Sequence, residues 1–171
     1  MTAQITPRGH RRSAAAEPSR LGLRALIGSG DRIGAVVLPV IVIGVALNLA
    51  FPDAFTMGGP PRWLQVVSVI LLAVGVVVWA WSVVLILTKV RDGELVTSGP
   101  YSLVIHPLYT SVALLVLPWA GFLLDTWLWA VIGLALYAVS RMFGPREEVA
   151  LAARFGPEWE AYCGHVKLPW L

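Results

Sequence analysis

Long apolar runs with few or no charged side chains alternate with short polar segments along the chain. A helix of about 20 apolar residues can cross a hydrocarbon core of about 30 Å, so each long run is a candidate membrane span. The pattern predicts four transmembrane helices, at residues 33–51, 63–87, 107–124 and 127–143. Asp125-Thr126 is a tight polar break between the last two runs, which predicts an antiparallel hairpin. Either residue is suited to capping the helix that follows.

Two short helices are expected after the fourth run. Gly144-Pro145 is predicted to end that run, because proline disrupts the interior of a helix. Pro145 then suits the first turn of a new helix that extends to Phe155. A last helix is expected over residues 158–164.

Composition favours a membrane protein. Hydrophobic residues make up 57% of the chain and charged residues 13%, whereas about a quarter of an ordinary soluble domain is charged. The mean hydropathy is +0.75, and tryptophan, which is enriched at membrane interfaces, occurs eight times. The single cysteine, Cys163, excludes an internal disulfide. We therefore expect an all-α membrane protein with about four transmembrane helices and short cytoplasmic C-terminal helices.

The basic residues predict the orientation in the membrane. With four spans, both termini and the loop 88–105 share one side, and all but Arg62 of the 13 Lys and Arg residues lie there. Because cytoplasmic loops carry an excess of Lys and Arg, this side is predicted to be cytoplasmic. Residues 1–32 are expected to form a basic, partly disordered N-terminal segment, and residues 33–171 an integral membrane domain.

Residues 95–109 differ from the runs around them, because they contain two prolines, a glycine, two tyrosines and a histidine. The Gly99-Pro100 pair disfavours regular helix, which leaves backbone N–H and C=O groups free. Lipid cannot satisfy such groups, so they must face protein, water or a ligand. The segment is predicted to form one wall of a polar-ligand site at the membrane surface.

Polar groups flank the predicted hairpin. His106 precedes it, and Glu147 and Glu148 follow it, so an antiparallel arrangement would bring the three together. A histidine with two carboxylates suits either a metal ion or a cationic polar ligand. Metal binding is disfavoured because there is one cysteine and no second histidine at helical spacing from His106, although His165 is a possible further ligand.

Simpler interpretations remain open for each of these side chains. His106 precedes a proline and could serve only to cap the third span. Glu147 and Glu148 could be ordinary acids in the first turn of a helix. The aromatic residues near the site could be plain interfacial anchors: Tyr101, Tyr109, Trp159 and Trp170.

Two motifs in the C-terminal half keep a fixed order around the hairpin. They consist of Gly99-Pro100-Tyr101, His106-Pro107-Leu108-Tyr109, Glu147-Glu148, Leu151, Phe155-Gly156, Trp159, Tyr162 and Pro169. This order resembles the isoprenylcysteine carboxyl methyltransferase family and its phospholipid methyltransferase relatives. Those proteins carry Gly-Pro-Tyr and Arg-His-Pro-x-Tyr after a membrane span, and Glu-Glu-x-x-Leu with Phe-Gly-x-x-Tyr-x-x-Tyr after a helical hairpin.

The resemblance implies a membrane methyltransferase that uses S-adenosylmethionine and releases S-adenosylhomocysteine. In that family the cofactor lies in a pocket facing the cytosol, and a lipid-like acceptor enters from the bilayer. Glu147 or Glu148 would bind the ammonium group of the cofactor. By position, the resemblance assigns the cofactor pocket to Gly99, Pro100, Tyr101, His106, Leu108, Tyr109, Glu147 and Glu148.

The chain departs from the family at two arginines. The arginine before His-Pro is Ile105 here, and the arginine one turn before the glutamate pair is Phe143. Both changes remove a cation that could hold a carboxylate of the cofactor or of the acceptor. We therefore expect an acceptor without a free carboxylate at its reacting end. The alternative is that Arg141 or Arg146 replaces the missing cation.

The expected function is methylation of a lipophilic small-molecule or lipid acceptor in the bilayer. Neither a nucleic-acid partner nor a resident metal is expected. The acceptor group, whether carboxylate, amine or hydroxyl, and the oligomeric state are left open at this point. The rival hypothesis is a catalytically silent membrane protein that keeps the fold as a binding or assembly module.

Overall fold

The computed structural model describes residues 38–90, 93–169 and 171, and within these ranges the chain is helical without any β-strand. Helices account for 79% of the structure, which confirms the predicted all-α class. The expected N-terminal segment 1–32 and the beginning of the first predicted span lie outside the described residues.

The helices follow the predicted order along the chain. The first described helix is Leu38–Ala50. The later elements are α2 (Pro52–Phe55), α3 (Arg62–Leu85), the π-helical turn η1 (Ile86–Val90), the 3₁₀ turn η2 (Gly99–Ser102), α4 (Pro107–Ser111), the π-helical turn η3 (Val112–Val116), α5 (Leu117–Leu123), α6 (Leu128–Phe155) and α7 (Pro157–His165).

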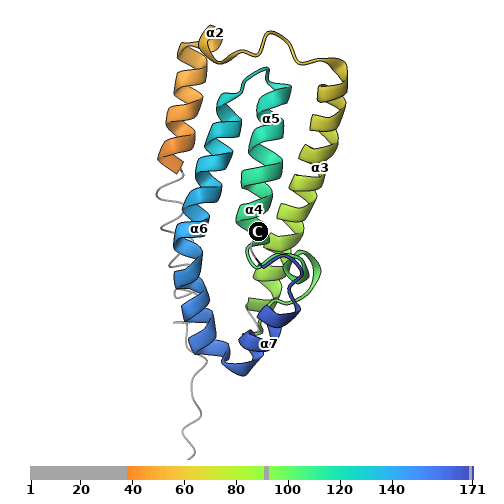
Figure 1. The fold of residues 1–171 in the computed structure, drawn as a ribbon, viewed down its shortest axis with the longest axis vertical. Coiled ribbons are helices and arrows are strands. Elements are labelled where there is room, and N and C mark those ends of the chain that lie inside the picture. Colours follow the sequence, from red (N-terminus) through yellow and green to blue (C-terminus); the bar gives the residue numbers. More distant parts are fainter. Residues whose placement is uncertain (1–37, 91–92, 170) are drawn as a thin grey trace, which may run out of the picture.

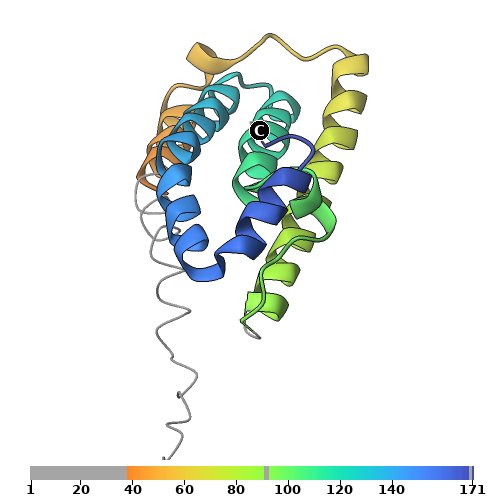
Figure 2. The ribbon, with the colours of Figure 1, turned by 60° about the horizontal axis from the view of Figure 1, so that its bottom comes forward.

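Four long helical segments stand side by side: the first helix, α3, α6 and the continuous segment α4–η3–α5 (Figures 1 and 2). The loop between α2 and α3 crosses one end of this bundle, where α5 also turns into α6. The segment that leads into α4 and the short helix α7 lie toward the other end. The chain therefore gathers its non-helical polar segment and its C-terminal helix at the same end.

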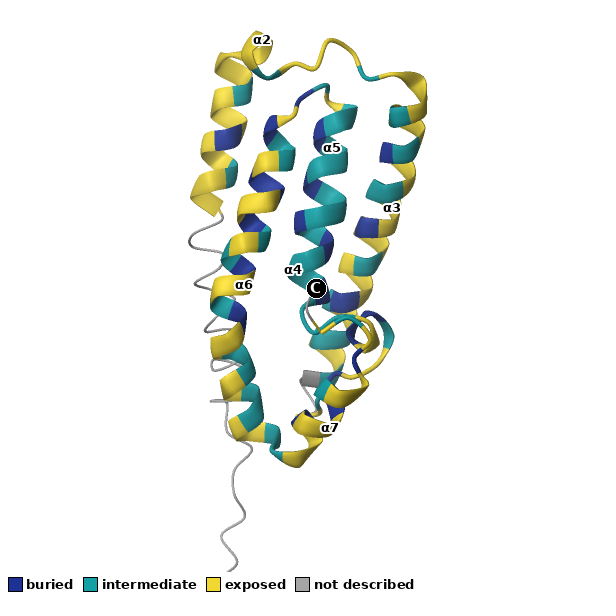
Figure 3. Ribbon diagram, viewed as in Figure 1, coloured by how far each residue is buried: buried dark blue, intermediate teal, exposed yellow. Residues whose placement is uncertain are grey.

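Among the described residues, two helical segments are long and apolar enough to cross a membrane: Arg62–Lys89, which runs from α3 into η1, and Leu128–Phe155, which is α6. Only 11% and 33% of their most apolar windows are buried, whereas the core helix of a soluble protein would be mostly buried. Figure 3 shows exposed residues along both helices, and large apolar side chains are among them, such as Val77 of α3 at 62% exposure. The helices Leu38–Ala50 and Pro107–Leu123 are apolar but shorter. The structure thus supplies two candidate membrane helices, and the four-span arrangement stays a prediction.

The predicted break at Gly144-Pro145 is wrong, because α6 continues without interruption to Phe155 with Pro145 inside it. A proline ring normally clashes with the Cβ of a helical residue before it, and Gly144 has no Cβ. The fourth predicted span and the first predicted C-terminal helix are therefore one helix. The separate short helix that follows is α7, which begins at Pro157.

The third helical segment contains a π-helical turn shortly before Pro118, and its last part, α5, packs closely on α6. Pro118 has no N–H to donate to the preceding turn, and the wider turn η3 ends at Val116, two residues before it. A Cβ on Gly121 would lie 2.6 Å from Cβ of Trp129, so only glycine permits this approach of α5 to α6. The predicted antiparallel hairpin is confirmed. Its core consists of Ala113, Leu117, Leu128, Ile132 and Leu136.

Asp125 fastens the loop after α2 to the turn between α5 and α6. Its carboxylate accepts hydrogen bonds from the Thr56 hydroxyl at 2.5 Å and from the Gly59 backbone N–H at 3.0 Å. The N-cap residue of α6 is Trp127, so neither polar residue occupies the expected capping position, but the hydroxyl oxygen of Thr126 accepts a hydrogen bond from the backbone N–H of Leu128, the first residue of α6, at 3.4 Å. The two polar residues of the break therefore have different roles: Asp125 joins the two loops, and Thr126 accepts a hydrogen bond from the first residue of α6.

The Asp125→Asn variant is expected to unfold at a lower temperature than the wild type at about pH 7, and to differ less from it at about pH 3. The hydrogen bond from Thr56, and then those from Gly59 and Met57, hold the pKa of Asp125 below its ordinary value of 3.8. A carboxyl with a lowered folded-state pKa stabilises the fold above its unfolded-state pKa, and this contribution is lost as the pH falls through the folded-state pKa. Asparagine tolerates the positive φ of 55° at this position, so the substitution adds no backbone strain. A pH-independent difference in detergent melting curves would contradict this role.

Candidate functional site

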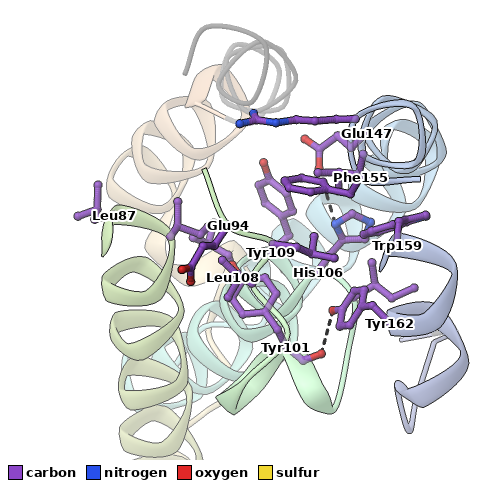
Figure 4. Close-up of a pocket in the computed structure, with 16 residues that line it drawn as sticks. Leu87, Glu94, Tyr101, His106, Leu108, Tyr109, Glu147, Phe155, Trp159 and Tyr162 are labelled. Carbon is purple, nitrogen blue, oxygen red and sulfur yellow. Dashed lines mark hydrogen bonds and ion pairs between the residues drawn. The ribbon is translucent and has the colours of Figure 1, made fainter. Parts of the chain in front are cut away.

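A pocket with a cavity volume of about 570 Å³ lies at the end of the bundle where the polar segment and α7 gather (Figure 4). Its walls come from η1, from the segment between η1 and α4, from α4 itself, and from α6 and α7. Pockets of roughly 300–1,000 Å³ are typical of small-molecule and cofactor sites. The lining side chains that carry or can gain a charge, apart from the tyrosines, are Glu94, His106, Glu147 and Arg154.

His106 lies between the two glutamates. Its Nε2 is 3.1 Å from Oε1 of Glu148, a residue 42 positions later, and its Nδ1 is 3.6 Å from Oε2 of Glu147. The side chains of His106 and Glu147 are each 14% exposed, so water screens their interaction only partly. The convergence expected from the hairpin is present. His106 occupies the N-cap position of α4 without a side-chain capping bond, so its ring serves the glutamates instead.

Local sequence holds the His106 ring in this position. Pro107 follows it as the first residue of α4 and is fully buried, which fixes the backbone beside the histidine. On the facing helix, a Cβ added to Gly144 would lie 3.2 Å from Nε2 of His106. The glycine therefore makes room for the ring, and the same residue allows α6 to pass through Pro145.

Aromatic side chains from the polar segment and from α7 form part of the wall. Tyr101, Trp159 and Tyr162 are buried in a cluster that joins the polar segment to α7. The Tyr162 hydroxyl donates a hydrogen bond of 2.8 Å to the backbone oxygen of Tyr101. Burial raises the pKa of both tyrosines, so both phenols are neutral at physiological pH. These residues are thus part of a core and not plain interfacial anchors, whereas Trp170 lies outside the described residues.

Five of the predicted cofactor residues line the pocket: Tyr101, His106, Leu108, Tyr109 and Glu147. Glu148 is not among the described lining residues, and it reaches the site through His106. Gly99 and Pro100 are also not among the described lining residues. Gly99 has a positive φ of 63°, and a Cβ there would lie 3.1 Å from the ring of Trp81, so this glycine lets the segment turn against α3.

The two arginines offered as replacement cations lie elsewhere. Arg141 and Arg146 are exposed, and neither is among the described residues that line the pocket. The Arg146 guanidinium lies 5.6 Å from the ring centroid of Phe143 on the same helix. The structure therefore does not bring these two arginines together with the lining residues.

Several lining residues were missed as site residues in the sequence. Arg154 lines the pocket and lies two helical turns after Glu147, a spacing that places both on one face of α6. Leu151 and Phe155 share that face, and Glu94 lies on the opposite wall (Figure 4). The helical period counted from Glu147 would have found the α6 residues, whereas the position of Glu94 depends on the path of a segment without regular structure.

The donor set suits an organic ligand better than a metal ion. Among the described residues, no group of three or more His, Cys, Asp and Glu side chains is arranged to hold a metal ion. The pocket combines one partly buried carboxylate, the faces of several aromatic rings and an apolar floor that includes Leu95 and Val96. A ligand with a cationic end and a flat or apolar body matches these surfaces.

Comparison with known proteins gives one match. The model of the isoprenylcysteine carboxyl methyltransferase family matches residues 64–153, which is more than half of the 171 residues. The matched stretch begins in α3, includes His106 and both glutamates, and ends within α6. No curated protein and no solved structure matches the chain.

Proposed function

The chain belongs to the isoprenylcysteine carboxyl methyltransferase family, whose members are membrane methyltransferases, and from this premise we propose that it transfers a methyl group from S-adenosylmethionine to a lipophilic or lipid-like acceptor. The observation that carries the proposal is the pocket in which Glu147 and His106 face a set of aromatic rings. A module that served only in assembly would need neither a carboxylate shielded from water in this way nor a cavity of cofactor size.

The residues present fit S-adenosylmethionine, which has an ammonium, a sulfonium and a carboxylate group. Glu147 would bind the ammonium, because a carboxylate that is largely shielded from water forms a strong charge-assisted hydrogen bond. The rings of Tyr109, Phe155 and Trp159 line the same cavity and suit a cation or a flat base. The ammonium, the sulfonium and the flat base of the cofactor thus each have a matching surface in the wall.

The side chains of the chain would orient the reactants and handle a proton. When bound, the cofactor supplies a methyl group attached to a positively charged sulfur. Glu148 and Glu147 contact the two ring nitrogens of His106 and so hold the imidazole in one orientation. His106 lines the pocket; with its Nε2 donating to Glu148 at 3.1 Å, its Nδ1 would receive the proton that an amine or hydroxyl acceptor must lose, and Glu147, whose Oε2 is 3.6 Å from Nδ1, would then pair with that N–H. Leu108 and Leu151 keep water from the same space.

The acceptor proposed for this chain has no free carboxylate at its reacting end. Ile105 lines the pocket in the place of the family arginine, and it packs against the buried cluster around Tyr101 and Trp159. A neutral, apolar side chain cannot pair with an anionic acceptor. An amine or hydroxyl group on a lipid fits this wall better than a prenylcysteine carboxylate does.

Transfer of labelled methyl groups tests the proposed function. The full-length chain in detergent would be incubated with methyl-labelled S-adenosylmethionine and a membrane lipid extract, and a prenylcysteine analogue and its neutral amide would be compared as acceptors. We expect label in the lipid fraction and no preference for the free carboxylate. Cofactor binding without transfer to any acceptor would instead favour the silent module, and efficient methylation of the free carboxylate would overturn the proposed acceptor class.

We also propose that the chain is a multi-pass membrane protein with four spans and both termini in the cytoplasm. Reporter fusions at Leu171 and within the loop 52–62 are expected to give opposite signals, cytoplasmic at the C-terminus and external in the loop. The reason is the distribution of basic residues, since Arg62 is the one Lys or Arg assigned to the external side. Equal signals from the two fusions would contradict the four-span arrangement.

A further inference from the structure

Arg154 is exposed to solvent like Arg141 and Arg146, but unlike them it lines the pocket, at a position that the sequence-based assignment of the site did not include. Its guanidinium carbon lies 5.1 Å from the ring centroid of Phe155, which lines the same cavity. In the part of the chain that the structure describes, no carboxylate lies within ion-pair distance of Arg154. A guanidinium presents a planar set of N–H donors that match a carboxylate, and these donors have no anionic partner here.

Other basic side chains do not compete for this role. His106 is engaged by both glutamates, and Lys89 pairs with Glu94 at 3.8 Å. Arg154 is therefore the one lysine or arginine among the described residues that line the pocket. An anion that enters the cavity meets this guanidinium, and otherwise apolar, aromatic or acidic groups and a histidine that already faces two carboxylates.

The spacing along α6 relates Arg154 to Glu147. Seven residues make roughly two helical turns, so both side chains lie on the same face with their backbones about 10 Å apart along the axis. Side chains on a helix lean toward its N-terminus, so Arg154 leans back toward Glu147. Figure 4 shows Glu147 and Phe155 on the same side of the cavity, across from Glu94 and Leu87. A carboxylate and a guanidinium thus lie on one face of α6 and line the same pocket, and no ion pair joins them in the described part of the chain.

We propose that Arg154 binds the carboxylate at the methionine end of the cofactor while Glu147 binds the ammonium next to it, so that the two side chains together hold an α-amino acid group. The inference rests on the proposed function and adds to it a residue outside the sequence-based assignment. An amino acid carries its ammonium and carboxylate on the same carbon, so the site for one must lie near the site for the other. A carboxylate and a guanidinium on one helix face provide this combination, and Ile105 leaves the acceptor side of the pocket neutral.

Titration with two ligands that differ in one group tests this assignment. The ligands are S-adenosylhomocysteine and its decarboxylated analogue, 5′-S-(3-aminopropyl)-5′-thioadenosine, which keeps the ammonium and lacks the carboxylate. Their dissociation constants would be measured for the wild type, Arg154→Gln, Arg146→Gln and Arg62→Gln in detergent. Arg62 begins α3 at the far end of the bundle and serves as the matched control.

We expect Arg154→Gln to bind S-adenosylhomocysteine about 10- to 100-fold more weakly than the wild type, and to bind the decarboxylated analogue within about threefold of the wild type. Unchanged binding of S-adenosylhomocysteine by Arg154→Gln would overturn the inference, and so would an equal loss for both ligands, which indicates a structural effect. If only Arg146→Gln bound S-adenosylhomocysteine more weakly, the carboxylate would be assigned to Arg146, one of the two arginines considered in the sequence analysis. Failure of the wild type to bind either ligand would refute the proposed function itself, and the inference with it.

Discussion

The Glu147→Gln variant is expected to bind S-adenosylhomocysteine about 10- to 150-fold more weakly than the wild type, which corresponds to about 1.5–3 kcal/mol for one charge-assisted hydrogen bond. Glutamine keeps the shape of the side chain and removes its charge. The Glu147 side chain is only 14% exposed and lines the pocket, so solvent cannot replace the lost interaction with the ammonium. Isothermal titration in detergent measures the change.

Two further variants make this result specific to Glu147. Glu148→Gln is expected to have a smaller effect on affinity, because Glu148 contacts His106 and is not among the described lining residues. Glu160→Gln, on an exposed position of α7, is the matched control for the loss of one negative charge. Wild-type affinity in Glu147→Gln together with a large loss in Glu148→Gln would contradict the assignment to Glu147 and indicate that Glu148 binds the ammonium.

The Trp159→Ala variant is expected to destabilise the fold by about 3–5 kcal/mol, the usual cost of truncating a buried tryptophan. Trp159 is 7% exposed and packs with Tyr101 and Tyr162 in the cluster that attaches α7 to the polar segment. Loss of that packing also opens one wall of the pocket. We expect a melting temperature lowered by roughly 6–20 °C and a loss of ligand binding beyond that of any single polar variant.

Matched tryptophan variants separate burial from residue type. Trp63→Ala removes a tryptophan that is 67% exposed at the beginning of α3, and it is expected to leave the melting temperature in detergent nearly unchanged. Trp159→Phe keeps most of the buried aromatic area and should recover most of the stability. If Trp159→Ala and Trp63→Ala lowered the melting temperature equally, the cluster would not be the element that holds α7 in place.

Much of the fold could be predicted because it depends on local patterns. Apolar runs located the helices, and the polar pair at Asp125 and Thr126 located the turn between α5 and α6. The break predicted at Pro145 failed for a reason that the proline alone does not reveal. The preceding glycine removes the clash that normally ends a helix, and the need for close packing against His106 is visible only in three dimensions.

The part of the site that depends on the hairpin could be predicted, because the hairpin brings together residues that are far apart in the sequence. Antiparallel helices brought His106 and the glutamates together as expected. Which glutamate faces the cavity depends on the rotation of α6 about its axis. Because α6 is unbroken at Pro145, the part of the helix before Pro145 sets that rotation, whereas the sequence predicted a new helix there. The same rotation places Arg154 in the lining of the cavity, while Arg141 and Arg146 stay outside that lining.

The most direct measurement is the binding of S-adenosylhomocysteine to the full-length chain in detergent, followed both by titration heat and by melting temperature. We predict saturable binding at one site per chain, and a melting temperature that rises with ligand concentration because the ligand binds only the folded state. The Glu147→Gln variant should reach the same plateau only at higher concentration. Absence of saturable heat, together with a melting temperature that the ligand does not change, would contradict the assignment of this pocket to the cofactor.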